Sequence, residues 1–131
     1  MRIDYQSVSK PKSYAFDFCV IGGGVAGIIV ARELVKKFPG NSVGLIESGD
    51  MTLDNLHNRA LKDVSFSDLS IKRNSREFAL GGATNTWGGL CTHFEDFEIQ
   101  GRNYLEAHDW PVSYEALNKY YQYASQNYDV A

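Results

Sequence analysis

The sequence predicts an α/β fold with a central parallel sheet. An apolar segment, residues 15–21, runs into a glycine-rich turn, and a helical pattern follows at once. A second apolar segment, residues 42–46, comes after that helix and ends in an acidic residue. A strand, a crossover helix and a second strand in this order form the unit from which parallel sheets are built.

The first strand is predicted over residues 15–21, which are apolar and partly β-branched, as in buried parallel strands. Cys19 lies inside this segment, where we expect a buried thiol that packs as a small apolar side chain.

The turn after the strand has the form G-x-G-x-x-G. Gly22 permits the tight turn, Gly24 leaves room for a pyrophosphate, and Gly27 lets the helix pack closely on the strand. The helix N-terminus then faces the phosphates with unpaired N–H groups. The motif predicts a Rossmann-like FAD/NAD(P)-binding domain, and its candidate cofactor-binding residues are Gly22, Gly23, Gly24, Val25, Ala26 and Gly27.

The helix is predicted over residues 25–38, ended by Pro39 and Gly40. Its apolar residues recur at helical spacing and predict one buried face. They are Val25, Ile28, Ile29, Ala31, Leu34, Val35 and Phe38.

Glu47 follows the second strand, 47 − 27 = 20 residues after Gly27. This matches the separation of about 20 residues at which an acidic side chain binds a ribose in dinucleotide sites. A carboxylate there repels a 2′-phosphate, which favours FAD or NAD over NADP. The alternative is that Glu47 only ends a strand and faces solvent.

A second glycine-rich block spans residues 80–89. Its bare backbone can approach a flat or charged ligand, and its short polar side chains can donate or accept hydrogen bonds. We interpret it as a turn that lines the ligand, in preference to a flexible loop, because a tryptophan stands between its glycines. Its glycines include Gly81 and Gly82, its short polar residues are Thr84, Asn85 and Thr86, and Trp87 follows them.

The remaining segments are less informative. Residues 1–14 are predicted to be a flexible lead-in, and residues 48–76 short helices and loops. A helix is predicted over residues 114–127, with Ser113 as N-cap and Glu115 in its first turn. Its apolar-aromatic face has no identifiable partner in the sequence.

Composition excludes several classes of protein. The chain has 131 residues, 44% of them hydrophobic and 22% charged, which is typical of a globular domain. A net charge of −3 argues against nucleic-acid binding. No segment has the length of a membrane span or the apolar core of a signal peptide, so we expect a cytoplasmic protein. The two cysteines and three histidines have no metal-binding spacing, and none is assigned a catalytic role.

Four features of the sequence together resemble glucose-methanol-choline (GMC) oxidoreductases. They are the motif at residues 22–27, Glu47, the block Leu-Gly-Gly-Ala-Thr-Asn-Thr-Trp-Gly-Gly and the later Trp-Pro-Val-Ser-Tyr-Glu-Ala-Leu. The similarity is to the N-terminal part of the branch with pyranose oxidases and sugar dehydrogenases, and it runs from Phe16 to Asp129. It implies that residues 15–131 are the N-terminal part of an FAD-binding domain, and that FAD takes a hydride from a CH–OH group of a sugar or other alcohol. It also implies cofactor-binding residues in the second glycine block, where Gly81, Gly82, Thr84 and Asn85 would line the pyrophosphate and the flavin ring, with Trp87 close by.

The resemblance also implies what this sequence lacks. Family members are longer and carry a substrate domain and a late catalytic histidine that nothing here matches, so we expect an N-terminal portion that is inactive alone. Some pyranose oxidases bind the flavin covalently through a histidine where this chain has Thr86, which predicts non-covalent FAD. An NAD-dependent dehydrogenase and a non-catalytic remnant or binding module stay open.

Overall fold

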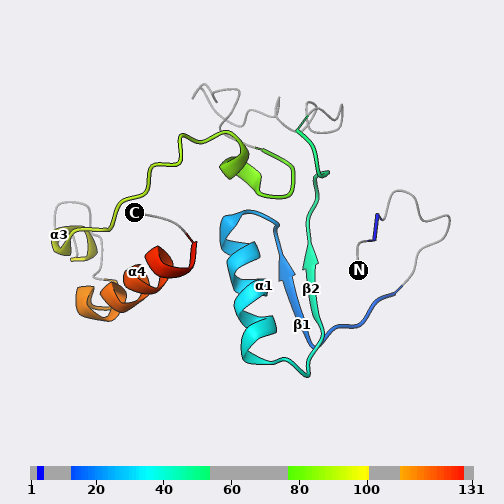
Figure 1. Ribbon diagram of the computed structural model, residues 1–131, viewed down its shortest axis with the longest axis horizontal. Coiled ribbons are helices and arrows are strands. Elements are labelled where there is room, and N and C mark those ends of the chain that lie inside the picture. The colour runs from blue at the N-terminus through cyan, green and yellow to red at the C-terminus, as the bar shows by residue number, and fades with distance from the viewer. Residues whose placement is uncertain (1–2, 5–12, 54–76, 101–109, 129–131) are drawn as a thin grey trace. The chain divides into compact units, whose positions relative to one another are not determined.

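The computed structural model describes residues 3–4, 13–53, 77–100 and 110–128 (Figure 1). The chain forms two compact units, Met1–Trp87 and Gly88–Ala131. The assignment of residues 15–131 to one cofactor-binding domain stays a prediction. The described part of the lead-in, residues 3–4 and 13–14, has no helix or strand. Most of the segment predicted to hold short helices and loops, residues 54–76, lies outside the described residues.

The first unit contains the predicted βαβ arrangement. Strand β1 (Phe18–Ile21), helix α1 (Val25–Lys37) and strand β2 (Val43–Ile46) follow one another in the chain. The two strands are parallel, and their register runs from Phe18 opposite Val43 to Ile21 opposite Ile46. Helix α1 lies alongside the strand pair (Figure 1). The α/β class with a parallel sheet is therefore confirmed.

Helix α1 packs against one face of the sheet. The rings of Phe18 and Phe38 stack with centroids 5.1 Å apart, which fixes the C-terminal end of α1 on this face. Cys19 and Ile21 alternate with the packed residues of β1 and are exposed. The expected burial of Cys19 is wrong, because side chains of a strand alternate between faces and α1 covers only one of them.

The two strands are tied together where they begin. Asp17 accepts hydrogen bonds at 2.7 Å from both the backbone N–H and the hydroxyl of Ser42, and its own N–H donates to that hydroxyl at 3.0 Å. These hydrogen bonds from Ser42 hold the pKa of Asp17 below its ordinary value of 3.8. The bend at residue 17 explains why β1 starts at Phe18, three residues later than the sequence predicted.

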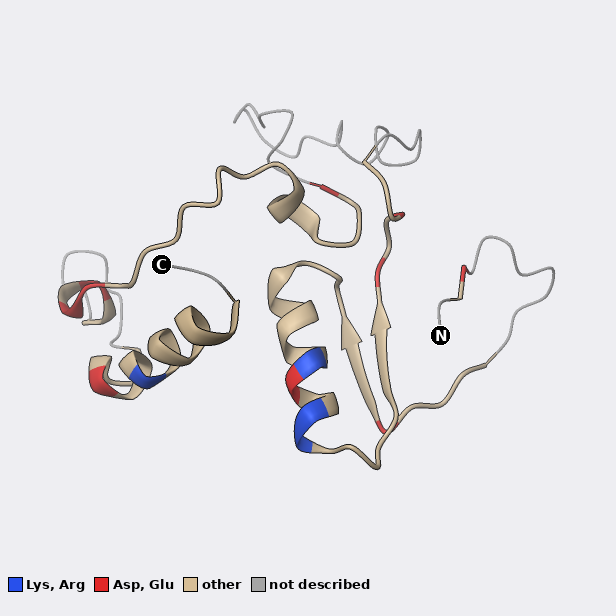
Figure 2. Ribbon diagram, viewed as in Figure 1, with Lys and Arg blue, Asp and Glu red and all other residues tan. Residues whose placement is uncertain are grey.

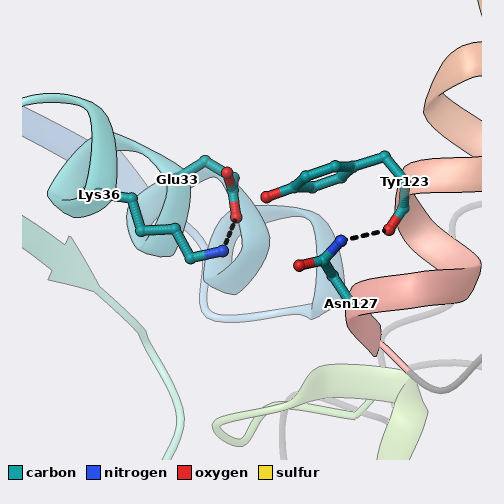
Figure 3. Close-up of polar contacts among 4 residues, drawn as sticks. All are labelled: Glu33, Lys36, Tyr123 and Asn127. Carbon is teal, nitrogen blue, oxygen red and sulfur yellow. Dashed lines mark hydrogen bonds and ion pairs between the residues drawn. The ribbon is translucent and has the colours of Figure 1, made fainter.

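The charged residues of α1 all lie in its second half (Figure 2). Lys36 forms an ion pair with Glu33, 2.8 Å between Nζ and Oε1 (Figure 3). Lys36 and Lys37 occupy the last turn, where positive charge is favourable to the helix dipole. The predicted apolar face is only partly covered, since Val25 and Val35 are about half exposed.

The second unit contains the short helix α3 (Asp96–Ile99) and the helix α4 (Tyr114–Tyr128). The Ala116 N–H donates to Oγ of Ser113 at 3.2 Å, which confirms Ser113 as the N-cap of α4. Tyr121 stacks on His93 with ring centroids 4.3 Å apart, and its hydroxyl accepts the Phe94 N–H at 3.4 Å. Part of the aromatic face of α4 therefore has a partner inside its own unit.

No helix within the described ranges is both long enough and apolar enough to span a membrane.

Candidate functional site

The first glycine loop, residues 22–24, lies where both parallel strands end. Gly22 has φ +100°, a left-handed conformation that glycine adopts without steric cost. Its N–H donates to the carbonyl of Ile46 at 2.8 Å, which continues the pairing of the strands into the loop. Ligands of open parallel sheets bind outside these carboxyl ends. The predicted turn is thus placed where such a ligand site is expected.

Gly27 lies on α1 where the helix is in close contact with the first glycine loop. A Cβ placed on Gly27 would overlap the carbonyl oxygen of Gly22 and would lie 3.5 Å from a methyl group of Val20. Only glycine can therefore occupy this helix position without moving the turn. The packing role that the motif predicted for Gly27 is confirmed.

Gly24 is the N-cap of α1 and leaves its amino end open. No side chain caps this helix end, and the first turn carries no acidic residue. A Cβ placed on Gly24 would meet no atom within 4 Å. Uncapped N–H groups, the positive end of the helix dipole and space beside Gly24 together suit a phosphate group. The residues present therefore fit the predicted pyrophosphate.

Glu47 binds the first glycine loop through its carboxylate. Oε2 accepts the Gly23 N–H at 2.6 Å, and Oε1 accepts the Gly49 N–H at 2.7 Å. The reading in which Glu47 merely ends a strand in solvent is wrong, because the residue is half-buried and both oxygens are bonded. The Ser48 hydroxyl also donates to Oε1, at 3.3 Å. An ionised carboxylate has about four acceptor positions, so one is left for a ribose hydroxyl. The ribose contact stays a prediction.

The second glycine turn, residues 80–85, packs against the first glycine loop. The Gly81 N–H donates to the carbonyl of Gly23 at 2.7 Å. A Cβ placed on Gly82 would lie 3.3 Å from Cα of Gly24, closer than ordinary contact. Sequence reasoning identified both glycine motifs as ligand-lining, but it did not predict that they touch each other.

The chain is hydrogen-bonded throughout the second glycine turn. Gly82–Asn85 form a single 3-10 turn, η2, after Gly81 at φ +95°. Oγ1 of Thr84 donates to the Gly81 carbonyl at 2.6 Å, and the Asn85 amide donates to two carbonyls of the same turn. Trp87 follows and is half exposed. The structure places all the predicted residues of this block in or next to one ordered turn, and their contact with a cofactor stays a prediction.

Gly49 and Ala79 support the site and were missed by sequence reasoning. Asp50 and Ala79 form a parallel bridge, and the Leu80 N–H donates to the Asp50 carbonyl at 2.9 Å. A Cβ placed on Gly49 would overlap the carbonyl group of Phe78. Ala79 is 1% exposed. The small size of Gly49 and Ala79 was the sequence signal that could have identified them, since small residues let the segments around residues 50 and 79 run side by side.

Within the described ranges, no three histidine, cysteine, aspartate or glutamate side chains gather closely enough to hold a metal ion.

A parallel βαβ unit with a glycine loop and an uncapped helix end is the arrangement of the Rossmann-like class of folds. The sequence model of the lycopene cyclase protein family matches residues 17–124, which include both glycine motifs and most of α4. The chain belongs to this family, which is of the FAD-binding type.

Two curated relatives share a shorter segment. Dehydrogenase mpl7 of Monascus purpureus and dehydrogenase citC of Monascus ruber are each 47% identical to the chain over 38 residues. The aligned segment is 29% of this chain and 6% of each relative. The aligned part is thus a small portion of each dehydrogenase. No solved structure gives a significant match.

Proposed function

We propose that this chain is the FAD-binding part of an oxidoreductase that oxidises a CH–OH group of a sugar or other alcohol. The observation that carries the proposal is the open amino end of α1 at Gly24, with a second glycine turn packed against it. The FAD-binding type of the family and the dehydrogenase names of the two relatives support a flavin-dependent oxidation. The likeness of the glycine blocks to GMC oxidoreductases supports the alcohol donor.

Each part of the site has a binding task in this proposal. The N–H groups at the start of α1 bind the pyrophosphate, and the backbone of Gly81 and Gly82 borders it. Glu47 accepts a hydrogen bond from the adenosine ribose while it holds Gly23. When bound, the flavin supplies the acceptor for the hydride. No residue of the chain is assigned as the base that takes the hydroxyl proton, so the chain by itself is expected to bind FAD and not to turn over.

Cofactor binding is tested on the purified 131-residue chain by isothermal titration with FAD and, separately, with NAD. We expect FAD to bind and NAD to bind far more weakly. The flavin should leave with the supernatant after denaturation and precipitation, because Thr86 cannot link it covalently. Flavin retained in the precipitate would contradict the non-covalent assignment.

The two alternatives give different outcomes. Preference for NAD would favour a nicotinamide-dependent dehydrogenase, for which the βαβ unit alone is sufficient. A folded chain that binds neither nucleotide would favour a non-catalytic binding module. The family match supports cofactor binding, because it covers both glycine motifs.

A further inference from the structure

We propose that Thr84 and Asn85 are positioning residues, whose side chains brace the second glycine turn and thereby hold the first glycine loop in the shape that a pyrophosphate needs. The ligand in this inference is the FAD of the proposed function, on which it rests. The bracing itself is a property of the chain without ligand and can be tested independently.

The hydrogen bonds of both side chains point back into their own turn. Oγ1 of Thr84 donates to the carbonyl of Gly81 at 2.6 Å. Nδ2 of Asn85 donates to the carbonyls of Leu80 and Gly82, each at 2.9 Å. The three acceptors are consecutive residues, so the two side chains together fix the backbone over the whole segment 80–82.

That segment is also the part of the turn that touches the first glycine loop. The Gly81 N–H donates to Gly23, and Gly82 lies against Gly24. Gly81 and Gly82 both have positive φ, +95° and +55°. Glycine has many other conformations open to it, so two consecutive left-handed glycines need outside contacts to stay in this one. Thr84 and Asn85 supply those contacts.

A direct contact of Thr84 or Asn85 with the flavin ring is the competing role. A comparison of FAD with ADP as ligand distinguishes the two roles. A residue that acts through the first glycine loop affects every ligand with a pyrophosphate, so FAD and ADP lose affinity together. A residue that touches the flavin ring affects FAD and leaves ADP unchanged.

The experiment compares Thr84→Val and Asn85→Leu with the wild-type chain. Titrations with FAD and with ADP should each show affinity about 3- to 10-fold lower for Thr84→Val, the range expected for one lost hydrogen bond. Asn85→Leu removes two hydrogen bonds and should lose more. Thr84→Ser keeps the hydroxyl and should restore both affinities.

Two matched controls lie in the other unit. Thr92→Val removes a hydroxyl that donates to the carbonyl of His93 at 3.4 Å. Asn127→Leu removes an amide that donates to the carbonyl of Tyr123 at 2.9 Å, one turn back on α4 (Figure 3). Both should keep wild-type affinity for FAD and for ADP, which shows that the chemical change alone has no effect.

Amide hydrogen exchange of the ligand-free chain gives a second readout. The Gly81 amide should exchange faster in Thr84→Val and Asn85→Leu, and at the wild-type rate in Thr84→Ser. Unchanged exchange would overturn the inference, and so would loss of FAD affinity with ADP affinity intact. If the wild-type chain bound neither nucleotide, the proposed function would fall, and the Gly81 exchange rate would still decide whether the two side chains brace the loop.

Discussion

The Gly23 N–H donates to Oε2 of Glu47 at 2.6 Å, which ties the end of β2 to the first glycine loop. The other oxygen, Oε1, accepts the Gly49 N–H at 2.7 Å. One carboxylate thus connects the predicted phosphate site with the residues that follow β2. Glu47, which is predicted to bind the ribose, therefore also holds the first glycine loop in place. Its substitution should affect both the ribose contact and the phosphate site.

Glu47→Gln should weaken FAD binding by about 1 to 3 kcal/mol, the scale of a lost hydrogen bond to a charged group. A glutamine amide group would also turn a donor toward the N–H of Gly23 or of Gly49. Titration calorimetry measures the effect, with Glu115→Gln on α4 as a control for charge. Equal FAD affinity in Glu47→Gln and wild type would remove Glu47 from the cofactor site.

Gly24→Val should abolish FAD binding and leave the fold intact. The position beside Gly24 is open and its φ of −72° suits any residue, so the apo chain tolerates a side chain there. The same side chain would fill the space that the pyrophosphate needs. The check pairs an FAD titration with a thermal melt. Near-normal FAD affinity in Gly24→Val would show that the phosphate binds elsewhere.

Gly27→Ala, unlike Gly24→Val, should destabilise the ligand-free chain. Its Cβ would overlap the Gly22 carbonyl oxygen, so either α1 or the turn must move. Overpacking of this kind costs about 1–3 kcal/mol. Urea unfolding of the ligand-free chain measures it, with Gly40→Ala as a control because a Cβ on Gly40 meets no atom within 4 Å. A stable Gly27→Ala chain would contradict the close packing of α1 on the turn.

Asp17 should make the stability of the first unit depend on pH in the acid range. Its pKa is lowered in the folded chain by the hydrogen bonds from Ser42. The stabilising contribution is therefore complete above the ordinary pKa of 3.8 and is lost as the pH falls through the lower folded-state pKa. Melting temperatures at falling pH should show this loss in the wild-type chain and a smaller one in Asp17→Asn. Parallel curves for the two chains would show that the link to Ser42 contributes nothing.

Ser113→Ala should destabilise α4 by about 1 kcal/mol, the usual effect of removing an N-cap. The Ala116 N–H would lose its acceptor at the start of the helix. Circular dichroism during urea unfolding detects the change, and Ser113→Asp, which keeps an acceptor, should restore stability. Similar stability of the Ala and Asp variants would mean that the cap is unimportant.

The local elements of this protein could be predicted from the sequence because each depends on short-range rules. Spacing of glycines and apolar residues located β1, α1 and β2 to within a few residues, and a hydroxyl before an apolar-aromatic pattern located the start of α4. Glu47 and the second glycine block were selected by residue type and spacing alone. Cys19 was placed wrongly, because burial depends on what covers each face of the sheet.

Only the tertiary structure decided how these pieces meet. The contact of Gly81 with Gly23 joins positions 58 residues apart (81 − 23), and no local pattern encodes such a pairing. The same holds for Gly49 against Phe78, where the absence of a side chain matters only once the two segments lie together. The sequence determined which residues can form turns, helices and strands, since backbone sterics act locally. The long-range packing determined that the two glycine motifs lie against each other.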